Sequence, residues 1–304
     1  MSRRLHYRLV DVFTDRPFAG NALAVFGDAA GLDEVEMQTL AAELNLAESS
    51  FVHDWTEAGL ADGADAAVRI FTPGTELPFA GHPTLGTAWV LAQTDGRSLL
   101  RLELAVGVLE ASIDRQMVTL GTTVPQVVRR IDRAMRDELA RALSLDPTEL
   151  RWPGADDLPA VVSCGTPYLV VPFARLEALA AIDARRAIAA VGVARKIDAD
   201  LAMVAPGNAG AIVDADVHVR VMSDPTMGAL EDAATGSAAV PLCAFIGIAD
   251  QLRDTALGLV IEQGVEMGRP SRLETEVIFD AIGMPTAARL SGSVVPIGEG
   301  WIEI

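Results

Sequence analysis

Hydrophobic and polar residues along the first part of the chain predict an opening pair of strands followed by a helix. Residues 5–13 alternate as a strand does, and turn residues at 14–21 lead into the apolar run 22–26, which together predict a hairpin-like opening. Residues 32–46 have helical spacing, with acidic residues at the start, where the helix dipole favours negative charge. The face predicted to be buried comprises Val35, Met37, Leu40 and Leu44.

Two further strands are predicted at residues 48–52 and 66–72, before a segment rich in glycine and proline. That segment leads into an apolar helix near residues 83–92. More strands are predicted within residues 98–113.

The pattern shifts near Pro125, which precedes a charged segment with amphipathic helical spacing at residues 127–143. We place the domain boundary there. The N-terminal half is then residues 1–124 and the C-terminal half residues 125–304, and we leave open that the last strand, about 290–304, returns to the first half.

The C-terminal half repeats the style of the first, with strands, a helical region and a glycine-bearing turn that enters a helix. Its predicted elements are strands within 160–173, at 201–206 and at 216–223, helices over 176–195 and within 230–246, and a closing hairpin within 289–304 around Gly298 to Gly300.

Two segments, one in each half, share one plan: a carboxylate, a short turn with glycine, and a helix of small and apolar residues. They are "ELPFAGHPTLGTAWVL" at 76–91 and "LEDAATGSAAVPLCAFI" at 230–246. The shared plan predicts two similar halves, each presenting a helix N-terminus.

In the first segment, Pro83 suits the first helical position, which leaves His82 near the N-cap. In the second, Thr235 or Ser237 is predicted to cap the helix. Because the first N–H groups of a helix have no partner within it, each end is predicted to bind an anion such as a carboxylate.

Composition narrows the class of protein. At 304 residues the chain is long enough for about two domains. Its net charge of −18 argues against a nucleic-acid partner, because such binding depends on Lys and Arg neutralising phosphates.

Its hydrophobic stretches are interrupted by charges, so we expect no membrane span, no signal peptide and a cytoplasmic location. Cys164 and Cys243 lack metal-ligand spacing and are predicted to be buried free thiols, with no metal site.

Five ordered blocks run from residue 10 to about residue 274. They are "DVFTDRPFAGNALAVF", "LNLAESSFV", "RIFTPGTELPFAGHPTLGTA", "EDAATGSAAVPL" and "EQGVEMGRPSRLE". Together they resemble the PhzF family of phenazine-biosynthesis isomerases. The resemblance implies an α/β (α+β) chain with the diaminopimelate-epimerase-like fold. In that fold, two similar domains each wrap a mixed, largely antiparallel sheet around a central helix, with the active site in the cleft between them.

By this resemblance, Glu48 is the acid/base that moves a proton between carbons of a small carboxylate-bearing substrate. His82 matches the family's active-site histidine, with Gly81 beside it. The counterparts from the second half are Asp232, Gly236 as a backbone donor, and Ser237. A homodimer and the absence of a cofactor are also implied. The nearest reference reaction is the isomerisation of trans-2,3-dihydro-3-hydroxyanthranilate.

Residue chemistry is compatible with this role, because a carboxyl group that both takes and gives a proton is a common general acid/base. Epimerases of this fold use two opposed cysteines, and the corresponding turns here have none, which disfavours a two-thiol racemase. The acidic insert at residues 54–67 is expected to reshape the rim of the site. The other histidines, His6, His53 and His218, show no spacing to acidic residues or cysteines that suggests a ligand set and are interpreted as structural.

Two alternatives to the isomerase remain open. One is a non-catalytic protein that binds a small anion or regulates a partner through the same donors. The other is a lyase or hydratase that uses the same acid/base to expel water.

Overall fold

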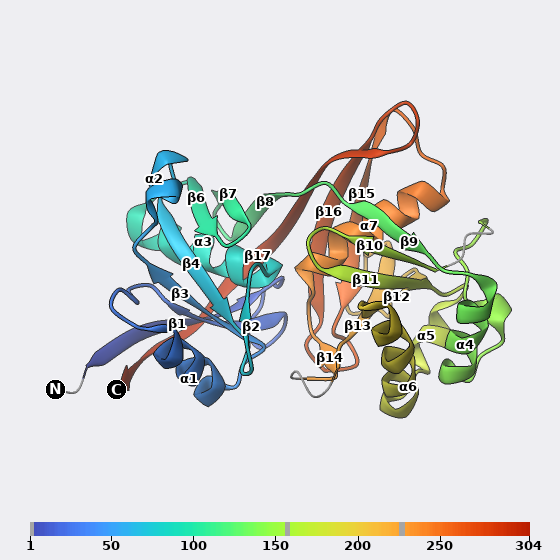
Figure 1. Ribbon diagram of the computed structural model, residues 1–304, viewed down its shortest axis with the longest axis horizontal. Coiled ribbons are helices and arrows are strands. Elements are labelled where there is room, and N and C mark those ends of the chain that lie inside the picture. The colour runs from blue at the N-terminus through green and yellow to red at the C-terminus, as the bar shows by residue number, and fades with distance from the viewer. Residues whose placement is uncertain (1–2, 156–158, 225–228) are drawn as a thin grey trace. The chain divides into compact units, whose positions relative to one another are not determined.

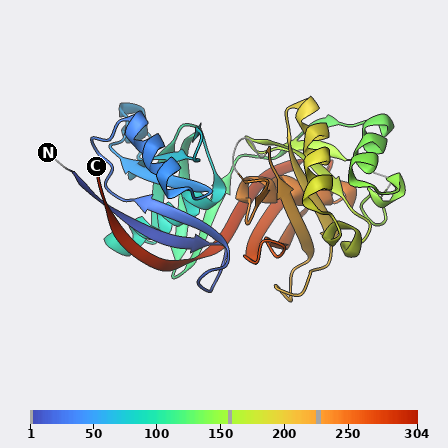
Figure 2. The same cartoon turned by 90° about the horizontal axis from the view of Figure 1, so that it is seen from below.

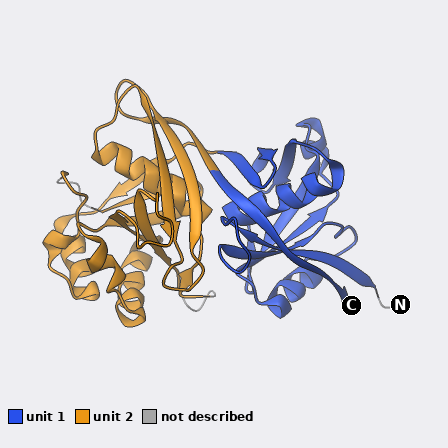
Figure 3. Ribbon diagram, turned by 180° about the vertical axis from the view of Figure 1, so that it is seen from behind, with its two compact units in different colours: residues 1–121, 291–304 blue, residues 122–290 orange. Residues whose placement is uncertain are grey.

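The computed structural model describes residues 3–155, 159–224 and 229–304, which form two compact units (Figure 3). The first unit comprises residues 1–121 and 291–304, and the second comprises residues 122–290. The C-terminal strand therefore runs back into the first unit.

The first unit is a sheet that closes around one helix, α3 (Gly81–Asp95) (Figure 1). β17 pairs with both β1 and β8, which completes the closure. Most strands pair antiparallel, whereas β2 with β3 and β4 with β6 pair parallel. The strands are β1 (Arg4–Val12), β2 (Asn21–Phe26), β3 (Glu48–His53), β4 (Ala66–Phe71), β5 (Glu76–Leu77), β6 (Leu99–Leu104), β7 (Gly107–Asp114), β8 (Met117–Thr122) and β17 (Pro285–Glu303). The predicted opening hairpin is confirmed by the antiparallel pairing of β1 with β2.

Helix α3 is buried along most of its length because its residues are small or apolar. A Cβ added at Gly86 would lie 2.5 Å from the Cδ2 atom of Leu23 and 3.0 Å from the Cγ2 atom of Val12. Glycine at this position therefore lets the helix approach β1 and β2 closely, which fixes where its N-terminus lies.

Outside the sheet lies α1 (Glu34–Leu44), which begins at a capping box formed by Asp33 and Glu36. Met37 and Leu40 are buried as predicted. Val35 is 73% exposed, so its assignment to the buried face was wrong. Residues three and four apart share a helix face, and Val35 lies only two positions before Met37, which turns it toward solvent.

The acidic segment at residues 54–67 contains a short helix, α2 (Glu57–Ala61). Thr56 precedes it, and both its backbone N–H and its hydroxyl donate to Glu103 on β6. The start of the insert is therefore tied to β6 through Glu103, and Asp65 near its end accepts the N–H of Arg101 on the same strand over 2.8 Å.

The predicted closing hairpin near the C-terminus was wrong: β17 runs as one strand along β1. Gly300 pairs with Tyr7 of β1, and a Cβ at Gly300 would lie 2.7 Å from the Tyr7 hydroxyl. The glycine accommodates a tyrosine ring over the strand and does not mark a turn.

The second unit is a sheet that packs against the buried helix α7 (Gly236–Ala249). Its strands are β9 (Gln126–Arg130), β10 (Ala160–Ser163), β11 (Pro167–Pro172), β12 (Asp200–Pro206), β13 (Val217–Met222), β14 (Glu231–Asp232), β15 (Thr255–Gln263) and β16 (Ser271–Phe279). Parallel pairs join β11 with β12 and β13 with β15, and the other pairs within this unit for which a register is known are antiparallel.

Three helices lie on the other face of this sheet, and Figure 2 shows α4 and α6 side by side. They are α4 (Arg133–Leu143), α5 (Leu176–Ala180) and α6 (Ala184–Ala194), with the single 3₁₀ turns η1 (Pro147–Glu149) and η2 (Arg195–Ile197). The core between them and the sheet includes Leu139, Phe173, Leu179 and Val191.

The predicted helix at residues 127–143 was wrong in its first part. Residues 126–130 form β9, which pairs with β10, and the helix begins only after Asp132. The Asp132 side chain accepts the N–H of Met135 as an N-cap. One amphipathic pattern thus covered two elements, a strand with β-branched residues and a capped helix.

The two units repeat one strand register. In the first, parallel β2 and β3 pair Leu23 with Glu48, and in the second, parallel β11 and β12 pair Tyr168 with Asp200. Glu48 and Asp200 therefore occupy equivalent positions. This repeat agrees with the prediction of two similar halves.

The same equivalence extends across the parallel pairs on the other side of each sheet. Ala67 of β4 faces Glu103 of β6, and His218 of β13 faces Glu262 of β15. The short strand before each central helix also corresponds, since β5 pairs with β4 as β14 pairs with β13.

Candidate active site

Glu48 and His82 meet inside the first unit. Glu48 opens β3, and His82 is the second residue of α3. The Nε2 atom of His82 lies 3.4 Å from the Oε2 atom of Glu48, and the two side chains are 4% and 17% exposed. The predicted acid/base and the predicted histidine are therefore direct neighbours.

The other ring nitrogen of His82 faces β2. Its Nδ1 atom lies 3.4 Å from the amide nitrogen of Asn21. Burial lowers the pKa of His82 to about 3, against a weaker opposing effect of a backbone hydrogen bond to Ala22. The ring is thus neutral at ordinary pH and carries one proton, on either nitrogen.

Helix α3 begins two residues earlier than expected. Ala80 is the N-cap residue, and Gly81, His82 and Pro83 follow as its first three helical residues. The prediction that Pro83 takes the first position was wrong. No side chain caps this end, so backbone N–H groups of its first turn are available to an anion.

Asp232 and the turn after it belong to the second unit. The Thr235 hydroxyl donates to the Oδ2 atom of Asp232 over 2.6 Å. Gln263, at the end of β15, donates to the Asp232 carbonyl over 2.8 Å and to the Thr235 hydroxyl over 2.9 Å. It also accepts the Thr235 N–H over 3.1 Å. One glutamine side chain therefore fixes the turn that carries Asp232.

Gly236 and Ser237 are the first residues of α7, after Thr235 as N-cap residue. The predicted side-chain cap was wrong, because the Thr235 hydroxyl is turned to Asp232 and the Ser237 hydroxyl lies 2.7 Å from that of Tyr168. Backbone N–H groups at this helix end are therefore not capped by a side chain.

Several neighbours of the predicted residues were not found from the sequence. Asn21, Tyr168 and Gln263 reach their partners from strands far away along the chain. Asn21 and Gln263 lie inside the recognised blocks, which is a weak signal. No spacing relates either to its partner.

His218 also has partners that the sequence did not reveal. Its ring lies between Glu262 and Glu266, and the side chain is fully buried. These residues come from β13, β15 and the segment after β15, so their contact depends on the sheet register.

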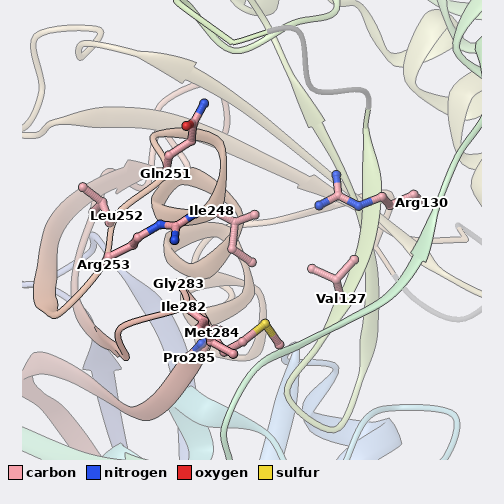
Figure 4. Close-up of a pocket in the computed structure, with 10 residues that line it drawn as sticks. All are labelled: Val127, Arg130, Ile248, Gln251, Leu252, Arg253, Ile282, Gly283, Met284 and Pro285. Carbon is pink, nitrogen blue, oxygen red and sulfur yellow. The ribbon is translucent and has the colours of Figure 1, made fainter.

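A separate pocket of about 300 Å³ lies in the second unit, where β9, the end of α7 and the segment before β17 meet (Figure 4). Arg130 and Arg253 line it together with apolar side chains such as Ile248 and Met284. None of the predicted site residues lines this pocket.

Other predictions concern metals, thiols and membranes. In the part of the chain that the structure describes, no group of His, Cys, Asp and Glu side chains is arranged to hold a metal ion. Cys164 and Cys243 are buried and free, and burial raises the pKa of Cys243 to about 12. Among the described residues, every helix is too short or too polar to span a membrane.

The fold has counterparts among solved structures. A PhzF family protein from Bacillus anthracis superposes with a TM-score of 0.83 at 24% sequence identity, over 99% of this chain and all of that one. A hydroxyproline epimerase from Agrobacterium vitis superposes with a TM-score of 0.66 at 12% identity, over 99% of this chain and 91% of that one. The predicted fold is confirmed: the chain has the epimerase-like α+β architecture.

Within that class, residues 10–300 match the PhzC-PhzF family, described as phenazine biosynthesis-like protein, and the chain belongs to this family. It is 34% identical over 305 residues to the trans-2,3-dihydro-3-hydroxyanthranilate isomerase of Pseudomonas fluorescens. The alignment covers 98% of this chain and 99% of that protein. The chain is thus a PhzF-like isomerase, as predicted.

Proposed function

We propose that this isomerase moves a proton between two carbons of a small carboxylate-bearing metabolite, without a cofactor and with Glu48 as the acid/base. The substrate of the Pseudomonas fluorescens relative, trans-2,3-dihydro-3-hydroxyanthranilate, is the first candidate. The observation that carries the proposal is the buried contact between Glu48 and the neutral ring of His82.

The reaction needs no net change of atoms. The Glu48 carboxylate takes a proton from one carbon, and the electron pair of that C–H bond spreads over the conjugated substrate. The protonated Glu48 then gives the proton to another carbon, which forms a new C–H bond. Product and substrate have the same formula, and Glu48 returns to its starting state.

His82 suits both states of Glu48 without becoming charged. When Glu48 is ionised, a proton on Nε2 of His82 donates to the carboxylate, and Nδ1 accepts from the Asn21 amide. When Glu48 is protonated, Nε2 accepts from it, and the proton on Nδ1 is held by the Ala22 backbone. In either neutral tautomer the ring contacts Glu48 without adding a charge to the site.

Backbone donors at the start of α3, with Gly81, are proposed to bind the substrate carboxylate. Asp232, Gly236 and Ser237 are proposed to serve the same reaction, Asp232 as a catalytic acid or base and the other two as binding groups. Their roles are tested by the same assay, one substitution at a time.

The test follows trans-2,3-dihydro-3-hydroxyanthranilate by proton NMR and mass spectrometry with wild type and Glu48→Gln. We expect wild type to give a product of unchanged mass and Glu48→Gln to be slower by about 10²- to 10⁴-fold. Loss of water from the substrate would indicate the lyase alternative. Tight binding without turnover would indicate the non-catalytic one, and equal rates for both proteins would remove Glu48 from the mechanism.

A further inference from the structure

A network of charged side chains lies in the second unit on the sheet face that carries α5 and α6. His218 and Arg220 project from β13 on the same face as Met222, which belongs to the core under α6. Arg220 is 5% exposed, and His218 and Glu262 are fully buried. Charged groups buried to this extent need partners, and here they have them.

His218 has a carboxylate at each ring nitrogen. Its Nδ1 atom lies 2.8 Å from Glu262, and its Nε2 atom lies 3.0 Å from Glu266. An ionised carboxylate only accepts hydrogen bonds, so both contacts are satisfied when the ring carries both protons. A neutral ring would present a lone pair to one of the two carboxylates.

Glu262 also accepts hydrogen bonds from backbone donors. It accepts the N–H groups of Ala209, Ala211 and Ile212, the last two over 2.9 and 2.8 Å. Hydrogen bonds of this kind favour the ionised form of a carboxyl group. A positive ring beside Glu262 is therefore electrostatically consistent.

Arg220 extends the network to the strand that bears Asp232. Its guanidinium binds Glu231 through two hydrogen bonds of 2.8 Å, and its Nε atom lies 3.9 Å from Glu266. Glu231 and Asp232 are consecutive in β14, so their side chains point to opposite faces. Holding Glu231 on one face places Asp232 on the other, the α7 side.

A second connection runs along β15. Gln263 follows Glu262 directly and makes the hydrogen bonds that fix the Asp232 turn. The His218 side chain therefore joins the two supports of Asp232, one through Glu262 and Gln263 and the other through Glu266, Arg220 and Glu231.

We propose that His218 acts as a positioning residue for Asp232, and that it does so as an imidazolium bridging Glu262 and Glu266. The role assigned to Asp232 rests on the proposed function, whereas the charge state of His218 does not. The charged groups around the ring are Glu262, Glu266, Arg220 and, through Arg220, Glu231, while β12 presents Ala205 opposite it.

The direction of titration agrees with this geometry. Burial alone would lower the pKa of His218, but the hydrogen bonds and charges of Glu266 and Glu262 outweigh it and raise the pKa above its usual value. Burial alone would raise the pKa of Glu266, but the hydrogen bond and charge of His218, a backbone hydrogen bond and the charge of Arg220 together lower it. A raised histidine pKa stabilises the fold below the ordinary value near 6.5, and this stability is lost as pH rises through the folded pKa.

The first experiment uses the full chain with ¹⁵N-labelled histidine and does not depend on any substrate. At pH 7.5 we expect two ring N–H signals from His218, which vanish in His218→Gln and persist in the control His53→Gln. His53 is a suitable control because its ring contacts only the Asp54 carbonyl among the hydrogen bonds described. A single ring N–H on His218 would overturn the proposal.

The second experiment uses a variant in which a neutral His218 ring can satisfy both of its contacts. In Glu266→Gln the amide can donate to an unprotonated Nε2 atom, so the pKa of His218 should fall, by on the order of one pH unit. The pH above which kcat/KM declines should move to a lower value by a similar amount, and kcat should change more than KM. An unchanged histidine titration would overturn the imidazolium bridge, and a shifted titration with an unchanged kinetic profile would overturn the positioning role. If wild type shows no turnover, the proposed function fails, and with it the role for Asp232, while the NMR result still decides the charge state.

Discussion

The two units place different side chains on one repeated register. Where the first unit has Glu48 at the start of β3, the second has Asp200 at the start of β12. Where α3 carries His82 as its second residue, α7 carries Ser237. The scaffold is thus common to both units, and the chemistry differs through a few side chains.

The supporting charges differ as well. Both units hold an arginine on the central strand against a glutamate on the short strand, Arg69 with Glu76 and Arg220 with Glu231. Only the second unit adds a histidine, since Ala67 occupies the position of His218. In the first unit, the proposed acid/base Glu48 lies where β3 meets the start of α3. In the second unit, Asp232 is supported by a network of buried charged side chains.

The largest expected difference between the units is in catalysis. Glu48→Gln should slow isomerisation by about 10²- to 10⁴-fold, because it removes the acid/base. Asp200→Asn, at the equivalent position, should change the rate far less, even though burial raises the pKa of Asp200. Steady-state kinetics of both variants measure this, and equal losses would show that the equivalent carboxylates share the chemistry.

The next difference concerns the paired arginines. The Arg220 side chain is 6% exposed and the Arg69 side chain is 26% exposed. Arg220→Ala leaves the mostly buried Glu231 side chain without its cation, and also removes the charge facing Glu266, so it should lower the free energy of unfolding by about 3–5 kcal/mol. Arg69→Ala should cost about 1 kcal/mol or less, because water replaces more of the lost contact. Urea unfolding compares the two, and a greater loss for Arg69→Ala would reverse the comparison.

Packing of the central helix gives a smaller effect. Gly86→Ala places a methyl group against Leu23 and should lower the free energy of unfolding by about 1–3 kcal/mol. Gly192 in α6 is exposed, and a methyl group added there would have no heavy atom within 4 Å. Because Ala favours the helix over Gly, Gly192→Ala should raise the free energy of unfolding by up to about 1 kcal/mol. Thermal unfolding of the two variants checks the opposite signs.

The last comparison concerns acid sensitivity of the first unit. Burial lowers the pKa of His82 to about 3, so between that value and about 6.5 the unfolded chain binds a proton that the folded chain does not. This contribution is present above the ordinary pKa and is lost on acidification, by at most about 1.4 kcal/mol per pH unit. Wild type should therefore lose stability more steeply than His82→Asn between pH 6.5 and 4.5. Parallel slopes would mean that the ring is not held neutral.

Local pattern was enough to predict most elements and the existence of two similar halves. It failed where one pattern covered two structures, as at residues 127–143, where a strand continues into a capped helix. It failed again at Val35, whose place on the helix was assigned to the wrong face, and at Gly300, where the contact with the Tyr7 ring depends on a strand distant in the sequence.

The six site residues came from motif resemblance, and their contacts could not be predicted. His82 and Asn21 lie on different elements, and only the closure of the sheet around α3 brings them together. His218 showed no useful spacing because its carboxylates lie 44 and 48 residues further along the chain. Such pairs depend on strand register, which a local pattern does not contain.

The most direct test of the central claim is deuterium entry in D₂O, followed by NMR with trans-2,3-dihydro-3-hydroxyanthranilate and with wild type, Glu48→Gln and Asp200→Asn in parallel. If Glu48 carries the proton, wild type and Asp200→Asn will form the product at similar rates, with deuterium on carbon to the extent that the proton on Glu48 exchanges with solvent, and Glu48→Gln will do neither on the same timescale. Deuterium entry at the wild-type rate with Glu48→Gln would contradict the account.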